Sequence, residues 1–428
     1  MSRRTFLLGV AGLCSSITLP LPAWGAVGLY EPFAFAFVSD VHLATGMPDS
    51  YKLLHESQLF LQDVIKSLNQ DKLDFVIFGG DQVDALGKDD SNWQLFLDVV
   101  QTLNAPWSFV LGEQDLVDVT PVDKMRTYGP DWKGRGIETD RPYWSFNPLP
   151  GVHIIGLDTS RPNSPTGDMS RRQLEWLQKD LEQNKRNFII VFSHHPLLPP
   201  PPYDGGPPWD EYICPQGAAA RELLARSRKV RLAVSGHVHV SRIQQEGDIW
   251  YVSCPSLAVY PCAYRIFRVT PESITVETYQ VNFPALIKKA RKNLETSTLA
   301  YKYDPARPAR FLEVVAGEHL DNDAMLPLAA GQGAKPLPKK KKKKGKPQAK
   351  AEPGKKKKKR EKKEPPQKTP EEKKPAEPPA PEKPQATEPV PEGAPTEAPP
   401  GPPAGEPAPG GGGAAPGPAE PDKDNGVK

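Results

Sequence analysis

The stretch FAFAFVSD, residues 33–40, is an unbroken apolar run that ends in two polar residues. A continuous apolar run of this length predicts a strand that is buried on both faces, as in the parallel part of an α/β sheet. Asp40 ends the run and His42 follows two residues later. The sequence therefore predicts that side chains able to bind a ligand stand at the carboxyl end of this strand.

The same pattern recurs along the chain. Buried strands are predicted in DFVIFGGD (74–81), PWSFVLGE (106–113), GVHIIGLDTS (151–160), NFIIVFSHHP (187–196) and VRLAVSGHVHV (230–240), and three more strands at 248–256, 264–270 and 273–281. Helical spacing of apolar residues predicts helices at 51–70, 92–103 and 170–184, the last capped by Ser170. Strands that alternate with helices and end in a strand-rich run predict a layered α/β fold with the helices outside.

Carboxylates and imidazoles follow these strands directly. In open α/β sheets the functional crevice lies beyond the carboxyl ends of the strands, so we expect these side chains to meet at one edge. They are Asp40, His42, Asp81, Asp84, Asp115, His194, His237 and His239.

Five short motifs carry these residues in a fixed order: SDVH, GGDQVD, LGEQD, SHHP and SGHVH. Together they resemble the calcineurin-like metallophosphoesterase family, whose pattern is D-x-H, G-D-x-x-D, G-N-H-D/E, H and G-H-x-H. The resemblance covers roughly residues 33–270. It implies a β-sandwich flanked by helices that hydrolyses a phosphate mono- or diester, or a phosphoanhydride, by attack of a hydroxide bridging two metal ions. Asp84 stands where the purple acid phosphatase branch has a tyrosine.

The resemblance also implies a role for each residue. Carboxylates and imidazoles suit Mn, Zn or Fe ions, and no thiolate is needed. Asp84 is expected to hydrogen-bond to the ligands or to the backbone, and His195 either contacts the substrate phosphate or, as we expect, packs behind the ligands. The first metal would be held by Asp40, His42 and His239, the second by Glu113, His194 and His237, with Asp81 bridging both.

The third motif departs from the family pattern at two functional positions. Glu113 stands in place of an asparagine ligand, and Gln114 in place of a histidine that protonates the leaving group, while Asp115 is retained. A side-chain amide donates a hydrogen bond but delivers no proton, so leaving groups of high pKa should suffer most. Two alternatives therefore stay open: a metal-binding but silent protein that recognises a phosphorylated ligand, and a hydrolase with another specificity, such as cyclic nucleotides, nucleotides or lipid headgroups.

The loop LLPPPPYDGGPPWDEYICPQG, residues 197–217, is the most conspicuous candidate for a specificity loop. Tyr203, Trp209 and Tyr212 either form a stacking wall or pack the loop onto its own domain. Cys254 and Cys262 either form a disulfide or remain buried free thiols.

Residues 1–26 predict an export signal, because an arginine pair precedes a short, proline-broken apolar run and a small-residue cleavage site. The segment SRRTFL resembles a twin-arginine signal, which implies a periplasmic or extracellular protein; a retained N-terminal anchor is the alternative.

Residues 332–428 predict a disordered tail after a phosphoesterase domain at 30–325, because Pro, Ala, Gly, Glu and Lys bury too little apolar area to fold. Residues 335–363 carry seventeen Lys or Arg and two Glu, whereas residues 364–428 carry six Lys and twelve acidic residues. The lysine clusters are expected either to bind an anionic envelope polymer, lipid or nucleic acid, or to act as a solvated spacer.

Overall fold

The computed structural model describes residues 30–45, 47–84, 90–128, 140–329 and 331–337. The predicted signal at 1–26 and the predicted tail from residue 338 onward lie outside these residues. Within them, no helix is both long enough and apolar enough to cross a membrane.

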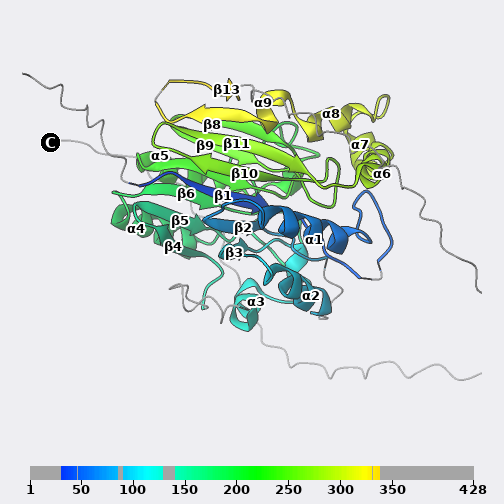
Figure 1. Ribbon diagram of the computed structural model, residues 1–428, viewed down its shortest axis with the longest axis horizontal. Helices are drawn as coiled ribbons and strands as arrows, with labels where there is room; N and C mark the ends of the chain where they lie inside the picture. The colour runs from blue at the N-terminus through cyan, green and yellow to red at the C-terminus, as the bar shows by residue number, and fades with distance from the viewer. Residues whose placement is uncertain (1–29, 46, 85–89, 129–139, 330, 338–428) are drawn as a thin grey trace, which may run out of the picture. The chain divides into compact units, whose positions relative to one another are not determined.

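Two sheets pack face to face and helices cover them, as Figure 1 shows. The first sheet has seven strands, in the spatial order β13 (Lys335–Pro336), β12 (Ala324–Pro327), β11 (Ser273–Gln280), β10 (Ala263–Val269), β1 (Phe33–Val38), β2 (Phe75–Gly79) and β3 (Trp107–Val110). The second has six, in the order β4 (Trp144–Leu149), β5 (Val152–Gly156), β6 (Phe188–Phe192), β7 (Val230–Ser235), β9 (Ile249–Ser253) and β8 (Arg242–Glu246).

Within each sheet, the strands that carry the predicted site residues run parallel to one another. β1, β2 and β3 run parallel in the first sheet, and β5, β6, β7 and β9 run parallel in the second. Each of these strands is continuously or almost continuously buried. The layered α/β fold predicted from the apolar runs is confirmed.

Helices cover the outer faces of both sheets. α1 (Ser57–Leu68) and α2 (Ser91–Val100) join the main core, where Phe96 packs edge-on against Phe78 of β2. α4 (Arg171–Gln183) and α5 (Gly217–Arg226) cover β5, β6 and β7 through a smaller core that contains Leu177 and Leu224. The predicted cap of α4 is present, because the Ser170 side chain accepts a hydrogen bond from the Gln173 backbone N–H.

Several elements were not assigned from the sequence. Among them are β4, β8, α3 (Pro121–Tyr128), α5, and a group after β11 formed by α6 (Pro284–Glu295), α7 (Thr298–Tyr303), α8 (Arg310–Ala316) and α9 (His319–Asn322). β12 and β13 extend the first sheet beyond residue 325, where the sequence placed the end of the domain, and reach into the segment assigned to the tail. β12 has the apolar sequence AMLP but only four residues, and β13 has two, so both are shorter than the runs from which strands were predicted.

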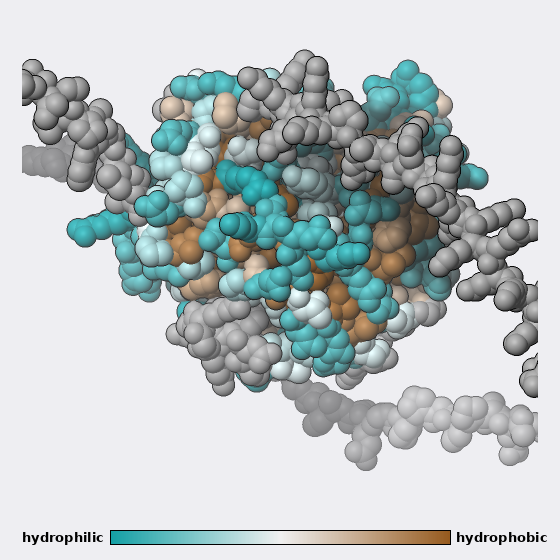
Figure 2. Space-filling model, viewed as in Figure 1, coloured by the Kyte–Doolittle hydropathy of each residue, from teal (hydrophilic) through white to brown (hydrophobic). Residues whose placement is uncertain are grey.

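Apolar side chains lie mainly between the layers. Figure 2 shows a mixed surface on one face, with hydrophilic groups interspersed among smaller apolar areas. Cys214, Cys254 and Cys262 are buried free thiols, so the alternative of a disulfide between Cys254 and Cys262 is not realised.

Aromatic rings join the two sheets. The Phe35 ring of β1 lies 5.0 Å from the ring of Phe75 and 4.7 Å from that of Phe267, both in its own sheet. It also lies 5.7 Å from the ring of Phe192 in the second sheet, in an edge-on arrangement. Phe35 is fully buried, so it stabilises both the first sheet and the interface between the sheets.

Phe35→Ala should lower the free energy of unfolding by about 3–5 kcal/mol, because it removes a buried aromatic ring and leaves a cavity between the sheets. Leu59→Ala is the control, since Leu59 lies on α1 with 42% of its surface exposed and should change stability by less than about 0.5 kcal/mol. Urea unfolding followed by tryptophan fluorescence measures both. Equal effects of the two changes would contradict the interface role of Phe35.

Asp158 follows β5 and connects it to α4. Its backbone N–H donates to the Gln173 side-chain oxygen at 2.8 Å, and its carboxylate accepts hydrogen bonds from the Ser160 backbone N–H at 3.0 Å and from the Ser160 hydroxyl. Burial raises the pKa of Asp158 to about 7. The neutral carboxyl is therefore favoured in the folded protein relative to the unfolded chain.

A raised carboxyl pKa makes the folded state lose stability as the pH rises from about 4, the ordinary value, through about 7. In metal-free protein, Asp158 should account for a loss of about 2–3 kcal/mol between pH 5 and pH 8. Asp158→Asn, which still accepts hydrogen bonds, should remove this part of the pH dependence and be the more stable protein at pH 8. Urea unfolding at both pH values with a chelator present tests this, and parallel pH profiles for the two proteins would contradict it.

Candidate metal centre

Five of the seven predicted metal ligands adopt a left-handed backbone conformation. Their φ angles are 54° for Asp40, 47° for His42, 49° for Asp81, 65° for His237 and 56° for His239. Such angles are uncommon for residues other than glycine and are strained by about 1–3 kcal/mol each. Strain at this one edge of the sheets is typical of a functional site that the surrounding fold holds in place.

Glycines let the loops approach closely. A side chain at Gly80 would meet the His194 ring, one at Gly112 would meet the Asp81 carboxylate, and Gly236 is similarly close to Asp40. Gly80 has a φ of 94°, which also favours glycine. The glycines of the GGD, LGE and SGH motifs are therefore required by space, and Gly80 is required by its backbone conformation as well.

Hydrogen bonds tie the loops after β1, β2 and β3 to one another. The His42 backbone N–H donates to the Asp81 carbonyl at 2.9 Å. The Asp115 carboxylate accepts from the Gly112 N–H at 2.9 Å and from the Val83 N–H at 3.1 Å. Burial and the charge of Asp81 raise the pKa of Asp115 to about 8. In these contacts Asp115 holds two loops together.

The first group of candidate ligands contains Asp40, His42 and His239, all buried. Asp40 Oδ1 lies 3.2 Å from His239 Nε2, and His42 Nε2 lies 3.3 Å from the same His239 nitrogen. His42 Nδ1 lies 3.0 Å from Asp84 Oδ1 and donates its proton there, which leaves Nε2 free to bind a cation. The hydrogen bond predicted between Asp84 and a ligand is present.

The second group contains Asp81, Glu113, His194 and His237, also buried. Glu113 Oε2 lies 3.0 Å from His194 Nε2, and Glu113 Oε1 lies 3.3 Å from His237 Nδ1. Burial alone would raise the pKa of Glu113, but His237 and His194 hold it well below its ordinary value. Glu113 thus occupies the position expected for a carboxylate ligand.

Asp81 faces both groups. Its Oδ1 lies 3.6 Å from His194 Nε2 in the second group, and its Oδ2 lies 3.9 Å from His42 Nε2 in the first. Oδ1 also accepts a hydrogen bond from the Gln114 backbone N–H at 2.9 Å. The carboxylate therefore stands between the two groups, as the bridging position implied by the family resemblance requires.

The donor atoms fit cations. His194 Nδ1 lies 2.8 Å from the Gly79 carbonyl oxygen, which only accepts, so Nδ1 carries a proton. The lone pair of Nε2 would then face the Glu113 carboxylate, which is repulsive unless a positive charge lies between them. Burial lowers the pKa of His194, yet Asp81 and Glu113 raise it well above its ordinary value. The buried His237 Nε2 has no hydrogen-bond partner among the residues that the structure describes.

Gln114 and His195 occupy different surroundings. Gln114 starts the short 3₁₀ helix Gln114–Leu116 and is half-buried beside Glu113. His195 is fully buried: its Nδ1 lies 3.0 Å from the Thr159 hydroxyl, its Nε2 donates to the Pro165 carbonyl at 3.1 Å, and its ring lies 4.0 Å from that of His237. With both ring nitrogens engaged, His195 packs behind a ligand, which favours the packing alternative.

The aromatic residues of the loop at 197–217 lie together, and one of them also approaches the metal centre. Tyr203 and Trp209 are buried in a cluster with α6, α7 and α8, where Trp209 stacks on Phe311 at 6.0 Å. Tyr212 remains half-buried, and its ring lies 6.2 Å from that of His237. Packing onto the domain thus describes all three residues, and Tyr212, whose ring lies 5.8 Å from that of Tyr203, in addition borders the metal centre.

Lys52 lies beside the metal centre and was not predicted from the sequence as a residue of the site. Its Nζ lies 3.2 Å from Asp84 Oδ1 and 3.2 Å from His42 Nδ1. It belongs to a segment expected to be helical, and a lone lysine on an amphipathic helix ordinarily faces solvent, so no pattern marked it. His55 is exposed, and His153 is buried against Asn147 and Asp180, so neither joins the centre, as predicted.

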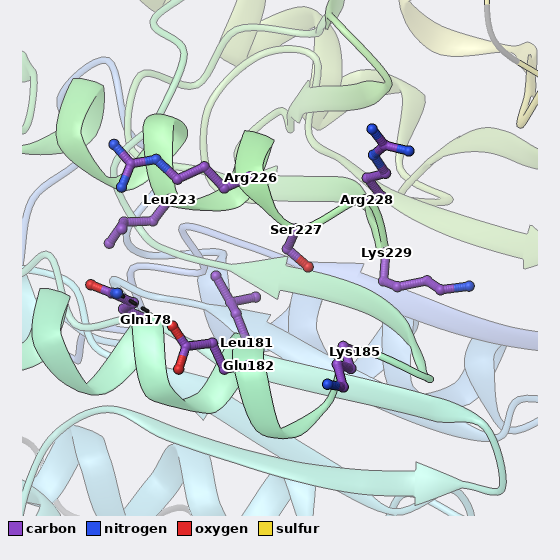
Figure 3. A pocket seen from close by; sticks show the side chains of 9 residues that line it. All are labelled: Gln178, Leu181, Glu182, Lys185, Leu223, Arg226, Ser227, Arg228 and Lys229. Carbon is purple, nitrogen blue, oxygen red and sulfur yellow. Dashed lines mark hydrogen bonds between the residues drawn. The ribbon is translucent and has the colours of Figure 1, made fainter.

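A separate hollow of about 360 Å³ lies between α4 and α5, near the amino-terminal ends of β6 and β7. Figure 3 shows Leu181 and Leu223 inside it, while the Arg226 and Arg228 side chains point away from each other. Its side chains do not converge on one point. The metal centre at the carboxyl ends of the strands remains the candidate functional site.

Comparison with known proteins places residues 33–241 within the family described as calcineurin-like phosphoesterase. A probable cyclic nucleotide phosphodiesterase of Synechococcus is 26% identical over 218 residues, which are 49% of this chain and 77% of the relative. A 3',5'-cyclic-nucleotide phosphodiesterase of Nostoc is 25% identical over 231 residues, 53% of this chain and 78% of the relative.

A probable glycerophosphodiester phosphodiesterase of Arcobacter nitrofigilis is 28% identical over 209 residues, 47% of this chain and 70% of the relative. Among solved structures, a dimetal phosphatase of Danio rerio has a TM-score of 0.48 at 15% identity, covering 58% of this chain and 96% of that one. The matched segment contains all five motifs and both ligand groups. Residues 33–241 of this chain are a calcineurin-like phosphoesterase domain.

Proposed function

We propose that the protein is a metal-dependent phosphoesterase whose centre holds two cations, of Mn, Zn or Fe type, and that it hydrolyses a small phosphorylated substrate. The position of Asp81 carries this proposal, because its two carboxylate oxygens face separate groups of buried ligands. Bound cations would supply Lewis-acid neutralisation of the charge on phosphoryl oxygens.

The protein's own residues orient and confine the reaction. Asp84 fixes the His42 ring through Nδ1, and the Gly79 carbonyl fixes the His194 ring in the same way. Such hydrogen bonds set the tautomer and the direction of each ligand. Asp115 joins the loops that carry Asp81 and Glu113, so it supports the site without needing to contact substrate.

The site lacks the residue that the family pattern uses to transfer a proton to the leaving group. Gln114 occupies the position where the family pattern has a histidine, and its amide delivers no proton. General acid catalysis contributes a factor of about 10² to 10⁴, so substrates with leaving groups of low pKa should be favoured.

A phosphodiester is the substrate class we favour, with cyclic nucleotides included. The support is that the relatives named above are phosphodiesterases of cyclic nucleotides or glycerophosphodiesters. Tyr212, half-buried beside His237, offers an aromatic ring to a base or an aryl group.

The second candidate is a metal-binding protein that lacks catalytic activity. The observation that favours it is the same amide at position 114, which removes an acid without an evident replacement among the described residues near it. Such a protein would bind metal and a phosphorylated ligand but not turn it over.

Export and anchoring are further proposals that rest on the sequence alone. We infer a twin-arginine-type signal at 1–26 and a lysine-rich tail that binds an anionic polymer or lipid of the cell envelope. Both segments lie outside the residues that the structure describes.

Metal analysis of the purified full chain should find about two ions per chain after reconstitution with Mn²⁺ or Zn²⁺. His239→Asn should lose about one of them, because it removes a ligand of the first group only. His319→Asn, a change of the same type at an exposed histidine, should keep both. Absence of bound metal in the unaltered protein would refute the dinuclear proposal, and metal without hydrolysis of any aryl phosphate mono- or diester would favour the silent protein.

The double change Glu113→Asn with Gln114→His should raise the rate most for esters with poor leaving groups, because it restores a proton donor. Comparison of an alkyl with an aryl phosphodiester measures this, and the gain should be about 10-fold or more larger for the alkyl ester. Glu113→Asn with Gln114→Asn is the control, since it keeps an amide at position 114. An equal gain for both esters, or none, would mean that residue 114 does not face the leaving group.

A further inference from the structure

The helices α6, α7 and α8 lie side by side, after the segment that matches the family, which ends at residue 241 (Figure 1). They share an apolar cluster with the loop at 197–217. Phe311 of α8 stacks on Trp209 of that loop, with the ring centroids 6.0 Å apart and the ring planes 14° apart. The ring of Tyr303, which ends α7, lies 5.4 Å from that of Phe311. This helical group therefore packs directly on the loop.

Contacts between aromatic rings continue from this loop to the metal centre. The ring of Trp209 lies 5.1 Å from that of Tyr203, and the ring of Tyr203 lies 5.8 Å from that of Tyr212. Tyr212 is half-buried, and its ring lies 6.2 Å from that of His237, a candidate metal ligand. A continuous series of ring contacts thus leads from α8 to the centre.

Lys302 of α7 contacts the part of the loop that carries Tyr212. Its Nζ lies 2.6 Å from Glu211 Oε1, and 28% of the lysine side chain is exposed. The same nitrogen lies 5.2 Å from the centroid of the Tyr212 ring and 5.1 Å from that of the Trp209 ring. A cation over an aromatic face is attracted by the ring quadrupole. The ammonium therefore ties Tyr212 to α7 and covers one face of its ring.

A second segment also holds this turn of the loop. The Thr166 hydroxyl donates to the Glu211 carbonyl at 2.7 Å, and the Gly167 backbone N–H donates to the Ile213 carbonyl at 3.1 Å. Tyr212 thus lies between two residues whose backbone is hydrogen-bonded to another part of the domain. The position of its ring is fixed from the backbone as well as through Lys302.

An aromatic ring held beside a metal ligand can recognise one part of a substrate. Stacking of a base on an aromatic side chain stabilises binding and tolerates different bases, because every base has a π face. We propose that Lys302 is a positioning residue that holds Tyr212 beside the metal centre, and that the centre therefore prefers phosphates whose substituent carries a nucleobase. This inference rests on the proposed function in so far as the centre binds a phosphate.

The experiment uses two phosphates that differ only in the base, adenosine 5'-monophosphate and ribose 5-phosphate. Calorimetric titration of the full chain in Mn²⁺ should show binding about tenfold or more tighter for the nucleotide, because only the nucleotide stacks on Tyr212. Tyr212→Leu should reduce this preference to about twofold or less. An undiminished preference in Tyr212→Leu would contradict the proposal.

Variants of Lys302 test the positioning role. Lys302→Met keeps the length of the side chain but removes the charge, so it should reduce the preference for the nucleotide about fivefold. Lys302→Arg keeps a cation over the ring and should keep the preference within about twofold of that of the unaltered protein. Lys289→Met is the matched control, since Lys289 of α6 also pairs with carboxylates, those of Asp49 and Glu56, and should leave the preference unchanged. A lysine that only stabilised the fold would affect the binding of both phosphates alike.

The effect of Lys302 should also depend on Tyr212. In a protein that already carries Tyr212→Leu, Lys302→Met should change the preference by less than about twofold, because the ring to be positioned is gone. An equal loss in both backgrounds would overturn the proposal. If Lys302→Met does not fold, Glu211→Gln, which removes only the ion pair, should still reduce the preference, and no reduction in that variant would contradict the proposal.

Failure of this inference differs from failure of the proposed function. Equal binding of the two phosphates to the unaltered protein in Mn²⁺ would overturn the inference and leave a phosphate-binding metal centre in place. Binding of neither phosphate would overturn both.

Discussion

Asp81 lies in the turn directly after β2 in a left-handed conformation, and its carboxylate lies between two groups of buried ligands. The loops after β1 and β3 are both bonded to the Asp81 segment, through the His42 and Gln114 backbone N–H groups. A displacement of this one residue would move candidate ligands in both groups. The arrangement of the centre therefore depends on the tight turn after β2, which Gly79 and Gly80 permit.

The strain and the buried charge of the centre are tolerated because the layers below it are rigid. Phe35 and Phe37 of β1 pack against Phe192 of β6, so the strands that end at Asp40 and His194 share one aromatic interface. Left-handed residues and clustered carboxylates both disfavour folding when considered alone. They persist here because the core fixes the ends of the strands from which the loops start.

Sequence patterns predicted the central strands, because continuous apolar runs mark parallel strands, and they predicted the helices at 51–70, 92–103 and 170–184. They also predicted that the ligands meet, because all these strands end at one edge of the fold. They did not predict α6–α9 or β12, which are short or only partly apolar. α6, α7 and α8 pack on the cluster that contains Tyr203 and Trp209, and β12 pairs with the edge strand β11. Lys52 was also beyond prediction. Its contact with Asp84 joins segments 32 residues apart, and nothing local to Lys52 records it.

Each ligand group draws residues from both sheets. In the first group, Asp40 and His42 follow β1 of the first sheet, whereas His239 follows β7 of the second. In the other group, Asp81 and Glu113 follow strands of the first sheet, whereas His194 and His237 follow strands of the second. A cation held by either group is therefore a crosslink between the sheets, placed at the end of the sandwich where the strands finish. Sliding of one sheet over the other would pull these ligands apart. Bound ions would therefore resist shear between the two sheets, in addition to any role in the reaction.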